Sequence, residues 1–194
     1  MAKFENGHVG HYIEGIAEHP VTKKILTVGT DGALNIWEPL NNKSSQRIPD
    51  IAGKNMTLTD LIITTNDMVV IAAFKEKSNL VFLPFVDLGK MDFLALDGGH
   101  NANITRLKNL SDAPMFLSLS GADIVGSMGT ITKIVLWESV FPPRKITEFQ
   151  DFGIVDSVAS WSAKILFCGF LDGSLTTKNL RSGAKVKSLS NAHD

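Results

Sequence analysis

Residues 26–37 have the sequence LTVGTDGALNIW, in which two apolar runs flank the turn Gly29-Thr30-Asp31-Gly32. Short apolar runs joined through Asp-Gly are a strong hairpin signal. The rest of the chain repeats this arrangement, and no segment holds a capped helical period, so the sequence predicts an all-β chain of antiparallel hairpins. The runs expected to form strands are Lys24 to Val28, Ala33 to Trp37, Met68 to Ala73, Asn79 to Leu83, Met115 to Leu119, Lys133 to Trp137, Ala163 to Cys168 and Leu175 to Thr177.

A repeat of about 46 residues underlies these hairpins. Three histidines that precede candidate first strands, His8, His100 and His193, are separated by 92 and 93 residues, which is two units each time. The longer third unit contains an enlarged loop, Gly121 to Thr132. Residues that end the third strands follow the same period at intervals of 46, 54 and 41, and they are Trp37, Leu83, Trp137 and Lys178. The four units are expected at residues 7–51, 52–97, 98–150 and 151–192.

The first unit carries the clearest pattern. It opens with Gly7-His8, continues with His19-Pro20, and contains the hairpin of residues 26–37. These residues resemble the WD-repeat family, whose unit of ~40–45 residues forms one four-stranded blade of a β-propeller. The third unit keeps Gly99-His100, the fourth has Lys178 in place of the family's Trp, and the second keeps only the strand rhythm. The resemblance implies about four blades, each a four-stranded antiparallel sheet, in an incomplete ring, because rings of this family usually contain more blades.

Many blades of that family carry a hydrogen-bonded set of His, Ser or Thr, Asp and Trp. A buried indole N–H needs an acceptor, and a hydroxyl can pass the hydrogen bond on to an imidazole that a carboxylate holds. We expect this network to be structural. A hydrolase triad is disfavoured because no nucleophile elbow or phosphate-cradling glycine loop is present. The resemblance assigns to these networks His8 (or His11), Thr27, Asp31 and Trp37 in the first unit, and His100 and Trp137 with Ser118 or Ser120 in the third.

The composition argues against several classes of function. The 194 residues carry 19 Lys plus Arg against 20 Asp plus Glu, a net charge of -1 without a basic stripe, so general nucleic-acid binding is not expected. The longest apolar stretch, Leu61 to Phe74, is interrupted by polar residues and is shorter than the ~20 residues that span a bilayer. Cys168 is expected to be buried, and the five histidines lack metal-ligand spacing. We therefore expect no membrane contact, metal or cofactor, and a cytoplasmic protein, with the nucleus as the alternative.

The expected function is that of a non-catalytic scaffold or adaptor that presents loop surfaces to protein partners in a larger complex, because binding residues concentrate in loops. One alternative is the substrate receptor of a ubiquitin ligase, for which Asn179-Leu180-Arg181 approximates the family motif Trp-Asp-x-Arg without the Trp. Another is an enzyme built on a propeller. The loop residues expected to contact partners are Thr30, Lys75, Glu76, Lys77, Asn101, Ile124, Val125, Met128, Phe170 and Arg181.

An open ring would leave the outer faces of its end blades uncovered. Exposed apolar faces of this kind mark interfaces. Three arrangements would cover them: further blades of a longer propeller, a second copy in a homodimer, or a different chain that completes the ring.

Overall fold

The computed structural model describes residues 7–39, 43–85, 88, 94–121 and 131–190. These residues form four antiparallel sheets of four strands each and contain no α-helix, as the sequence predicts. No helix in the described ranges could therefore cross a membrane. Blade by blade, the strands are β1 (Ile13–Glu18), β2 (Ile25–Gly29), β3 (Leu34–Glu38) and β4 (Lys43–Ile48); β5 (Thr57–Ile63), β6 (Met68–Phe74), β7 (Ser78–Pro84) and β8 (Leu94–Asp97); β9 (Ile104–Asn109), β10 (Met115–Ser120), β11 (Ile131–Glu138) and β12 (Arg144–Phe152); β13 (Ile154–Ser160), β14 (Ile165–Phe170), β15 (Leu175–Asn179) and β16 (Lys185–Leu189).

The predicted runs are the second and third strands of the four blades. Each begins and ends within two residues of its prediction. The residues predicted to end the third strands all occupy the same place, one position before the strand ends, and they are Trp37, Leu83, Trp137 and Lys178. The hairpins that define the repeat are therefore confirmed.

Two predicted boundaries differ from the structure. Strand β12 continues to Phe152, so the third blade runs past the boundary expected at residue 150. The enlarged loop was expected to end at Thr132, but β11 begins at Ile131. Thr132 is buried, and its hydroxyl donates to the carbonyl oxygen of Ile154 at 3.0 Å. The chain is already in a strand there because Ile131 and Thr132 pair with Phe152 and Asp151 of β12. His193 lies outside the described residues.

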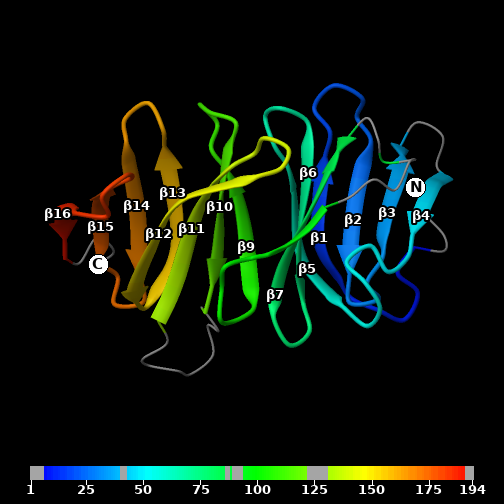
Figure 1. The fold of residues 1–194 in the computed structure, drawn as a ribbon, viewed down its shortest axis with the longest axis horizontal. Coiled ribbons are helices and arrows are strands. Elements are labelled where there is room, and N and C mark those ends of the chain that lie inside the picture. Colours follow the sequence, from blue (N-terminus) through cyan, green and yellow to red (C-terminus); the bar gives the residue numbers. More distant parts are fainter. Residues whose placement is uncertain (1–6, 40–42, 86–87, 89–93, 122–130, 191–194) are drawn as a thin grey trace.

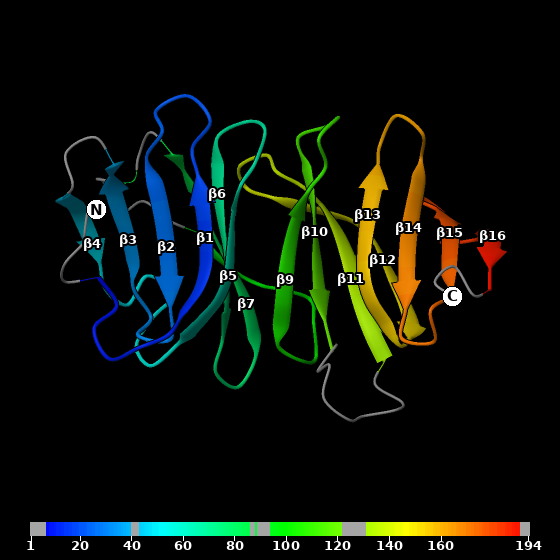
Figure 2. The same cartoon turned by 180° about the vertical axis from the view of Figure 1, so that it is seen from behind.

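The four sheets stand side by side in chain order, with blade 1 and blade 4 at opposite ends (Figures 1 and 2). The ring of blades is open. Strands β1 and β5 contact each other, as do β5 and β9, so the first strands of successive blades lie along the inside. We call the edge that carries the β2–β3, β6–β7 and β14–β15 turns the lower face, and the edge with the β1–β2, β5–β6 and β13–β14 turns the upper face, as they appear in Figure 1.

The hydrophobic core consists of three clusters, each of which lies between two neighbouring blades. One cluster joins blades 1 and 2, a second joins blades 2 and 3, and a third joins blades 3 and 4. Between blades 2 and 3, the ring of Phe82 lies 5.7 Å from that of Phe116, which stacks on Trp137 at 6.2 Å. Burial of each such side chain contributes ~1.5–3 kcal/mol, so the contact between neighbouring blades is the main source of stability.

Polar contacts between blades repeat with the period of the sequence. At the upper face, His19 Nε2 lies 3.2 Å from Asp67 Oδ1, 48 residues away. The Thr65 hydroxyl donates to the carbonyl of Ala113, again 48 residues away. Asp112 accepts hydrogen bonds from the β13–β14 turn, 48 to 50 residues further on. Each upper turn is thus tied to the next blade's equivalent turn, which fixes the angle between blades.

The first strand of every blade has a β-bulge at the same place. The pairing shifts between Ile13 and Gly15, between Leu58 and Asp60, and between Ile154 and Asp156, and at the matching step of β9. These shifts give a residue-by-residue alignment of the four blades. A Cβ atom on Gly15 would lie only 2.8 Å from a backbone nitrogen of β5, so glycine permits the close approach of blades 1 and 2.

Candidate functional site

Blade 1 holds a chain of buried hydrogen bonds that runs from the loop before β1 to strand β3. His8 Nδ1 lies 2.7 Å from Asp31 Oδ1, and His8 Nε2 lies 3.0 Å from Thr27 Oγ1. The indole Nε1 of Trp37 donates to Thr27 Oγ1 at 2.9 Å. The structure therefore brings together the four residues that the resemblance assigned to the first unit, with His8 rather than the alternative histidine in the network.

Asn35 and Arg47 complete this network, and the sequence analysis did not single them out. Asn35 Nδ2 lies 2.9 Å from His8 Nε2, and Arg47 donates to Asn35 Oδ1 at 3.5 Å and to Asp31 Oδ2 at 2.8 Å. Because the Asn35 oxygen faces Arg47, its amide nitrogen donates to Nε2, which leaves the imidazole hydrogen on Nδ1, facing Asp31. Burial raises the pKa of Asp31, but the hydrogen bonds from His8 and Arg47 outweigh it and lower that pKa below its usual value. Asp31 is thus ionised at neutral pH.

Blade 3 has an equivalent network, to which no carboxylate belongs among the described residues. His100 Nε2 lies 2.7 Å from Ser118 Oγ, which accepts the indole hydrogen of Trp137 at 2.9 Å. His100 Nδ1 lies 2.6 Å from Ser120 Oγ, so both candidate serines take part. Burial lowers the pKa of His100 to about 4, and nearby Lys133 adds to this effect. His100 is therefore a neutral imidazole at physiological pH.

Blades 2 and 4 have other residues at the tryptophan position. Leu83 occupies it in blade 2 and is buried in the core. In blade 4 the residue is Lys178, which is buried with its Nζ 2.7 Å from Asp151 Oδ2. Burial raises the pKa of Asp151, but the hydrogen bond from Lys178 outweighs it and lowers that pKa. An ion pair thus replaces the indole hydrogen bond in blade 4.

Most of the predicted interaction residues that the structure describes lie on the lower face. Thr30, Lys75–Lys77 and Phe170 belong to or adjoin the turns between second and third strands, and Asn101 lies in the connection from β8 to β9. Lys75, Glu76, Lys77 and Asn101 are exposed, and Thr30 and Phe170 are half-buried. His11 is exposed beside the same face, with Nδ1 3.4 Å from the Thr30 hydroxyl.

Arg181 lies elsewhere, in the connection between β15 and β16 on the upper face. Its guanidinium sits 5.2 Å from the ring centre of Trp161, and its backbone N–H donates to Asn179 Oδ1. The Arg181 side chain thus packs on its own blade. Three other predicted residues lie outside the described residues, and they are Ile124, Val125 and Met128.

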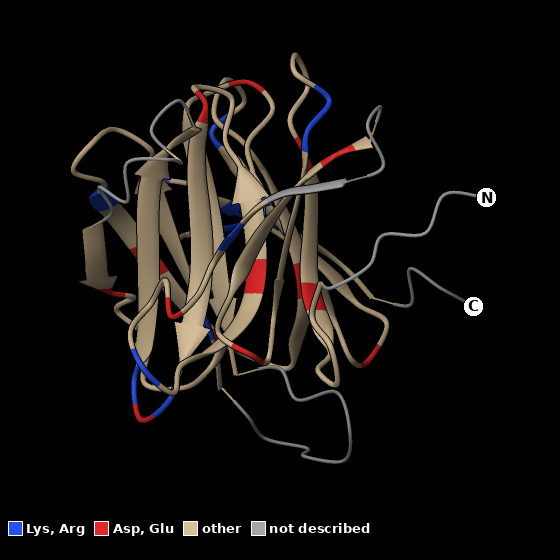
Figure 3. Ribbon diagram, turned by 90° about the vertical axis from the view of Figure 1, so that its right-hand side faces the viewer, with Lys and Arg blue, Asp and Glu red and all other residues tan. Residues whose placement is uncertain are grey.

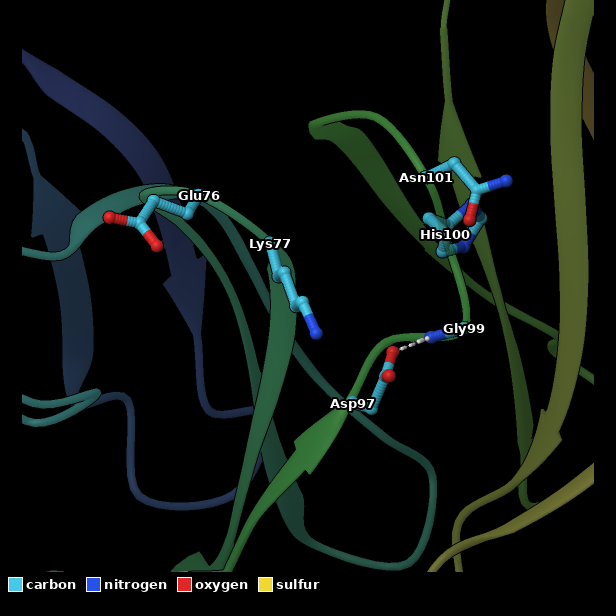
Figure 4. A pocket seen from close by; sticks show the side chains of 6 residues that line it. All are labelled: Glu76, Lys77, Asp97, Gly99, His100 and Asn101. Atoms are coloured by element: carbon cyan, nitrogen blue, oxygen red, sulfur yellow. Dashed lines mark hydrogen bonds between the residues drawn. The ribbon is translucent and has the colours of Figure 1, made fainter.

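A polar pocket of about 370 Å³ opens on the lower face between blades 2 and 3 (Figure 4). It joins the β6–β7 turn to the β8–β9 connection, and its lining residues are Glu76, Lys77, Asp97, Gly99, His100 and Asn101. The carboxylate of Asp97 accepts the backbone N–H of Gly99 at 2.8 Å, which holds the connection in place. Figure 4 shows the Lys77 side chain directed towards the Asp97 side of the pocket, and the Glu76 side chain directed away from it.

This pocket contains three of the predicted interaction residues, Glu76, Lys77 and Asn101. Asp97 was not predicted as a site residue, and His100 was predicted only as part of the structural network. Lys77 offers a cation, Asp97 a carboxylate and Asn101 an amide to the pocket, a set suited to hydrogen bonding and ion pairing with a polar partner. Among the described residues, no group of three or more His, Cys, Asp or Glu is placed to hold a metal ion.

Charged residues of both signs are spread over the described strands and loops, and neither sign gathers in one stripe (Figure 3). The single cysteine, Cys168, is buried in β14, and burial raises the pKa of its thiol to about 11. No protein-family model matches this chain, and no curated protein matches it significantly.

Proposed function

We propose that this protein is a non-catalytic WD-repeat scaffold whose lower face binds a protein partner. The observation that carries the proposal is the pocket between blades 2 and 3, which combines loop residues from two blades around a fixed floor. Surface loops on a rigid framework are where binding residues concentrate.

The floor of the pocket is rigid because His100 is hydrogen-bonded on both ring nitrogens to strand β10. The neighbouring residues Gly99 and Asn101 are therefore held relative to the blade. The β6–β7 turn carries Glu76 and Lys77 on a two-stranded hairpin whose strands are buried in the core. A partner with charged and amide groups would meet donors and acceptors that need little reordering, which lowers the entropic cost of binding.

A charge exchange on the pocket tests the proposal. The double variant Glu76→Lys/Lys77→Glu keeps the net charge and changes only exposed side chains. The matched control is Glu18→Lys/Lys23→Glu, an exposed ion pair near the upper face whose Nζ and Oε1 lie 2.9 Å apart. Affinity purification from cells is followed by quantitative mass spectrometry, with thermal melting to show that all three proteins fold.

We expect at least one protein to co-purify with the wild type and with the control, and to be lost from the Glu76/Lys77 variant. Equal recovery of every protein with all three baits would overturn the proposal. The proposal would also be overturned if no protein were recovered with the wild type in larger amounts than with empty beads.

A further inference from the structure

The two end blades each have one sheet face that no other blade covers among the described residues. In blade 4, Val158 is 58% exposed and Phe167 is 39% exposed. In blade 1, Ile13 is 58% exposed and Ile16 is 68% exposed. All four side chains lie on first or second strands, which are the inner strands of a blade. Large apolar side chains in regular strands are normally buried, so these two faces need an explanation.

The register shows that the free face of blade 4 is the kind of face that the other blades bury against their successor. The residues aligned with Phe167 in the second strands are Leu26, Val70 and Leu117. Each of them is fully buried, and each belongs to the cluster that joins its blade to the next one. Phe167 is the fourth member of this row, and no blade formed by the described residues lies in front of it.

The free face of blade 1 is the kind of face that the other blades bury against the blade before them. The residues aligned with Ile13 in the first strands are Leu58, Ile104 and Ile154, all buried. The residues aligned with Ile16 are Leu61, Leu107 and Ser157, also buried. In blade 3, Ile104 and Leu107 belong to the cluster with the preceding blade. Blade 1 thus presents the face that normally receives a preceding blade.

A hydrogen bond between blades 2 and 3 has its counterpart residues on the free faces of blades 4 and 1. Asp60 accepts the backbone N–H of Leu61 through Oδ1 and the N–H of Leu107, in the next blade, through Oδ2 at 2.7 Å. Asp156 occupies the aligned position in blade 4 and accepts the N–H of Ser157 through Oδ1 in the same way. The Asp156 side chain is half exposed, and Lys108 of blade 3 also pairs with Oδ1, at 2.5 Å. The donor aligned with Leu107 in blade 1 is the backbone N–H of Ile16.

We propose that a second copy of this chain closes the ring, with blade 4 of each copy packed against blade 1 of the other. Each chain carries one face of each kind, and the two faces repeat the contact that blades 2 and 3 make within the chain. Two copies related by a two-fold axis, the commonest symmetry of oligomers, bury both faces of both chains in two identical contacts and form eight blades. Asp156 of one copy accepts the Ile16 N–H of the other.

This assembly does not depend on the lower-face function proposed above. The first test is the solution mass of the 194-residue chain by light scattering over a dilution series. We expect a species of twice 21.1 kDa. A species of 21.1 kDa at every concentration, or one larger than two chains, would overturn the proposal.

Two variants show which faces make the contact. Phe167→Lys changes the free face of blade 4, and Ile16→Glu changes the free face of blade 1. Both positions are exposed in the single chain, so each variant should remain folded by circular dichroism, and Val158→Lys replaces Phe167→Lys if it does not. Each variant alone has both of its contacts altered and should be monomeric. The exposed upper-face substitution Val21→Lys should leave the dimer intact.

Mixing the two variants distinguishes the proposed pairing from others. A mixed dimer has one unaltered contact, from blade 4 of the Ile16→Glu chain to blade 1 of the Phe167→Lys chain. Its other contact brings the new Lys near the new Glu. We expect the equimolar mixture to recover the dimeric mass. Persistence of monomers in the mixture, or of dimers in either variant alone, would contradict the pairing of blade 4 with blade 1.

Discussion

His8 Nδ1 and Asp31 Oδ1 lie 2.7 Å apart in blade 1, so a carboxylate accepts the imidazole hydrogen there. In blade 3 the partner of His100 Nδ1 is the neutral hydroxyl of Ser120, at 2.6 Å. Two networks with the same layout therefore differ in charge. The carboxylate of Asp31 is also paired with Arg47, whereas His100 is buried next to hydroxyl groups. The burial of His100 decides how blade 3 responds to acid.

We expect His100 to make the stability depend on pH between about 4 and 6.5. Its pKa in the folded chain, about 4, lies below the ordinary value of 6.5, so the unfolded chain binds the proton first as the pH falls. The contribution of His100 to the free energy of unfolding is therefore complete above about pH 6.5. It decreases as the pH falls to about 4, by on the order of 3 kcal/mol over the whole window. Urea denaturation of the wild type and His100→Gln at about pH 7 and about pH 4.5 measures it. The variant should lose less stability on acidification, and equal losses would contradict the prediction.

Trp37 should be a major contributor to the stability of blade 1. Trp37→Ala removes a buried side chain and the donor to Thr27, which costs ~3–5 kcal/mol. Trp37→Phe keeps most of the ring but loses the N–H, so its cost should be smaller, ~1–2 kcal/mol. Chemical denaturation of the two variants gives both values. A Trp37→Ala protein that unfolds at the wild-type denaturant concentration would show that the network contributes nothing.

The sequence predicted the second and third strands because they are apolar runs between turn residues, and in blades 1 to 3 both faces of these strands are buried. Strand β6 is almost wholly buried, so its run of apolar residues stands out from the turns. The outer strand β16 has five exposed residues, and β13 has only three of its seven residues buried, so neither differs in composition from a loop. Their place follows only from pairing with a neighbouring strand.

The candidate site was predictable where residues share one blade and not where two blades meet. Ser118 and Ser120 are two positions apart in a strand and point to the same side, which is why both reach His100. The pocket brings Lys77 of the β6–β7 turn near Asn101 of the β8–β9 connection. Their proximity depends on the packing of blade 2 against blade 3, and no local pattern encodes that angle.

Asp60 should matter for the contact between blades 2 and 3. Asp60→Ala leaves the Leu107 N–H without its acceptor at a buried position, which costs ~1–3 kcal/mol. Asp60→Asn keeps one acceptor oxygen and removes a buried charge. Burial of that charge is unfavourable and raises the pKa of Asp60. In urea denaturation, the free energy of unfolding of the Asn variant should therefore be closer to that of the wild type than the value for the Ala variant. Asn and Ala variants of equal stability would show that the hydrogen bond to Leu107 is not important.

Cys168 should be unreactive in the folded protein. Its side chain is fully buried in β14, and burial raises the pKa of the thiol to about 11, so the reactive thiolate is scarce at neutral or mildly alkaline pH. A chromogenic disulfide reagent at about pH 8 should label the native chain only at the rate at which blade 4 opens. In concentrated urea, labelling should be complete within the mixing time of a manual experiment. Because Cys168 contributes to the core between blades 3 and 4, the native labelling rate also reports how often that contact opens. Rapid labelling without denaturant would show that blade 4 does not stay packed against blade 3.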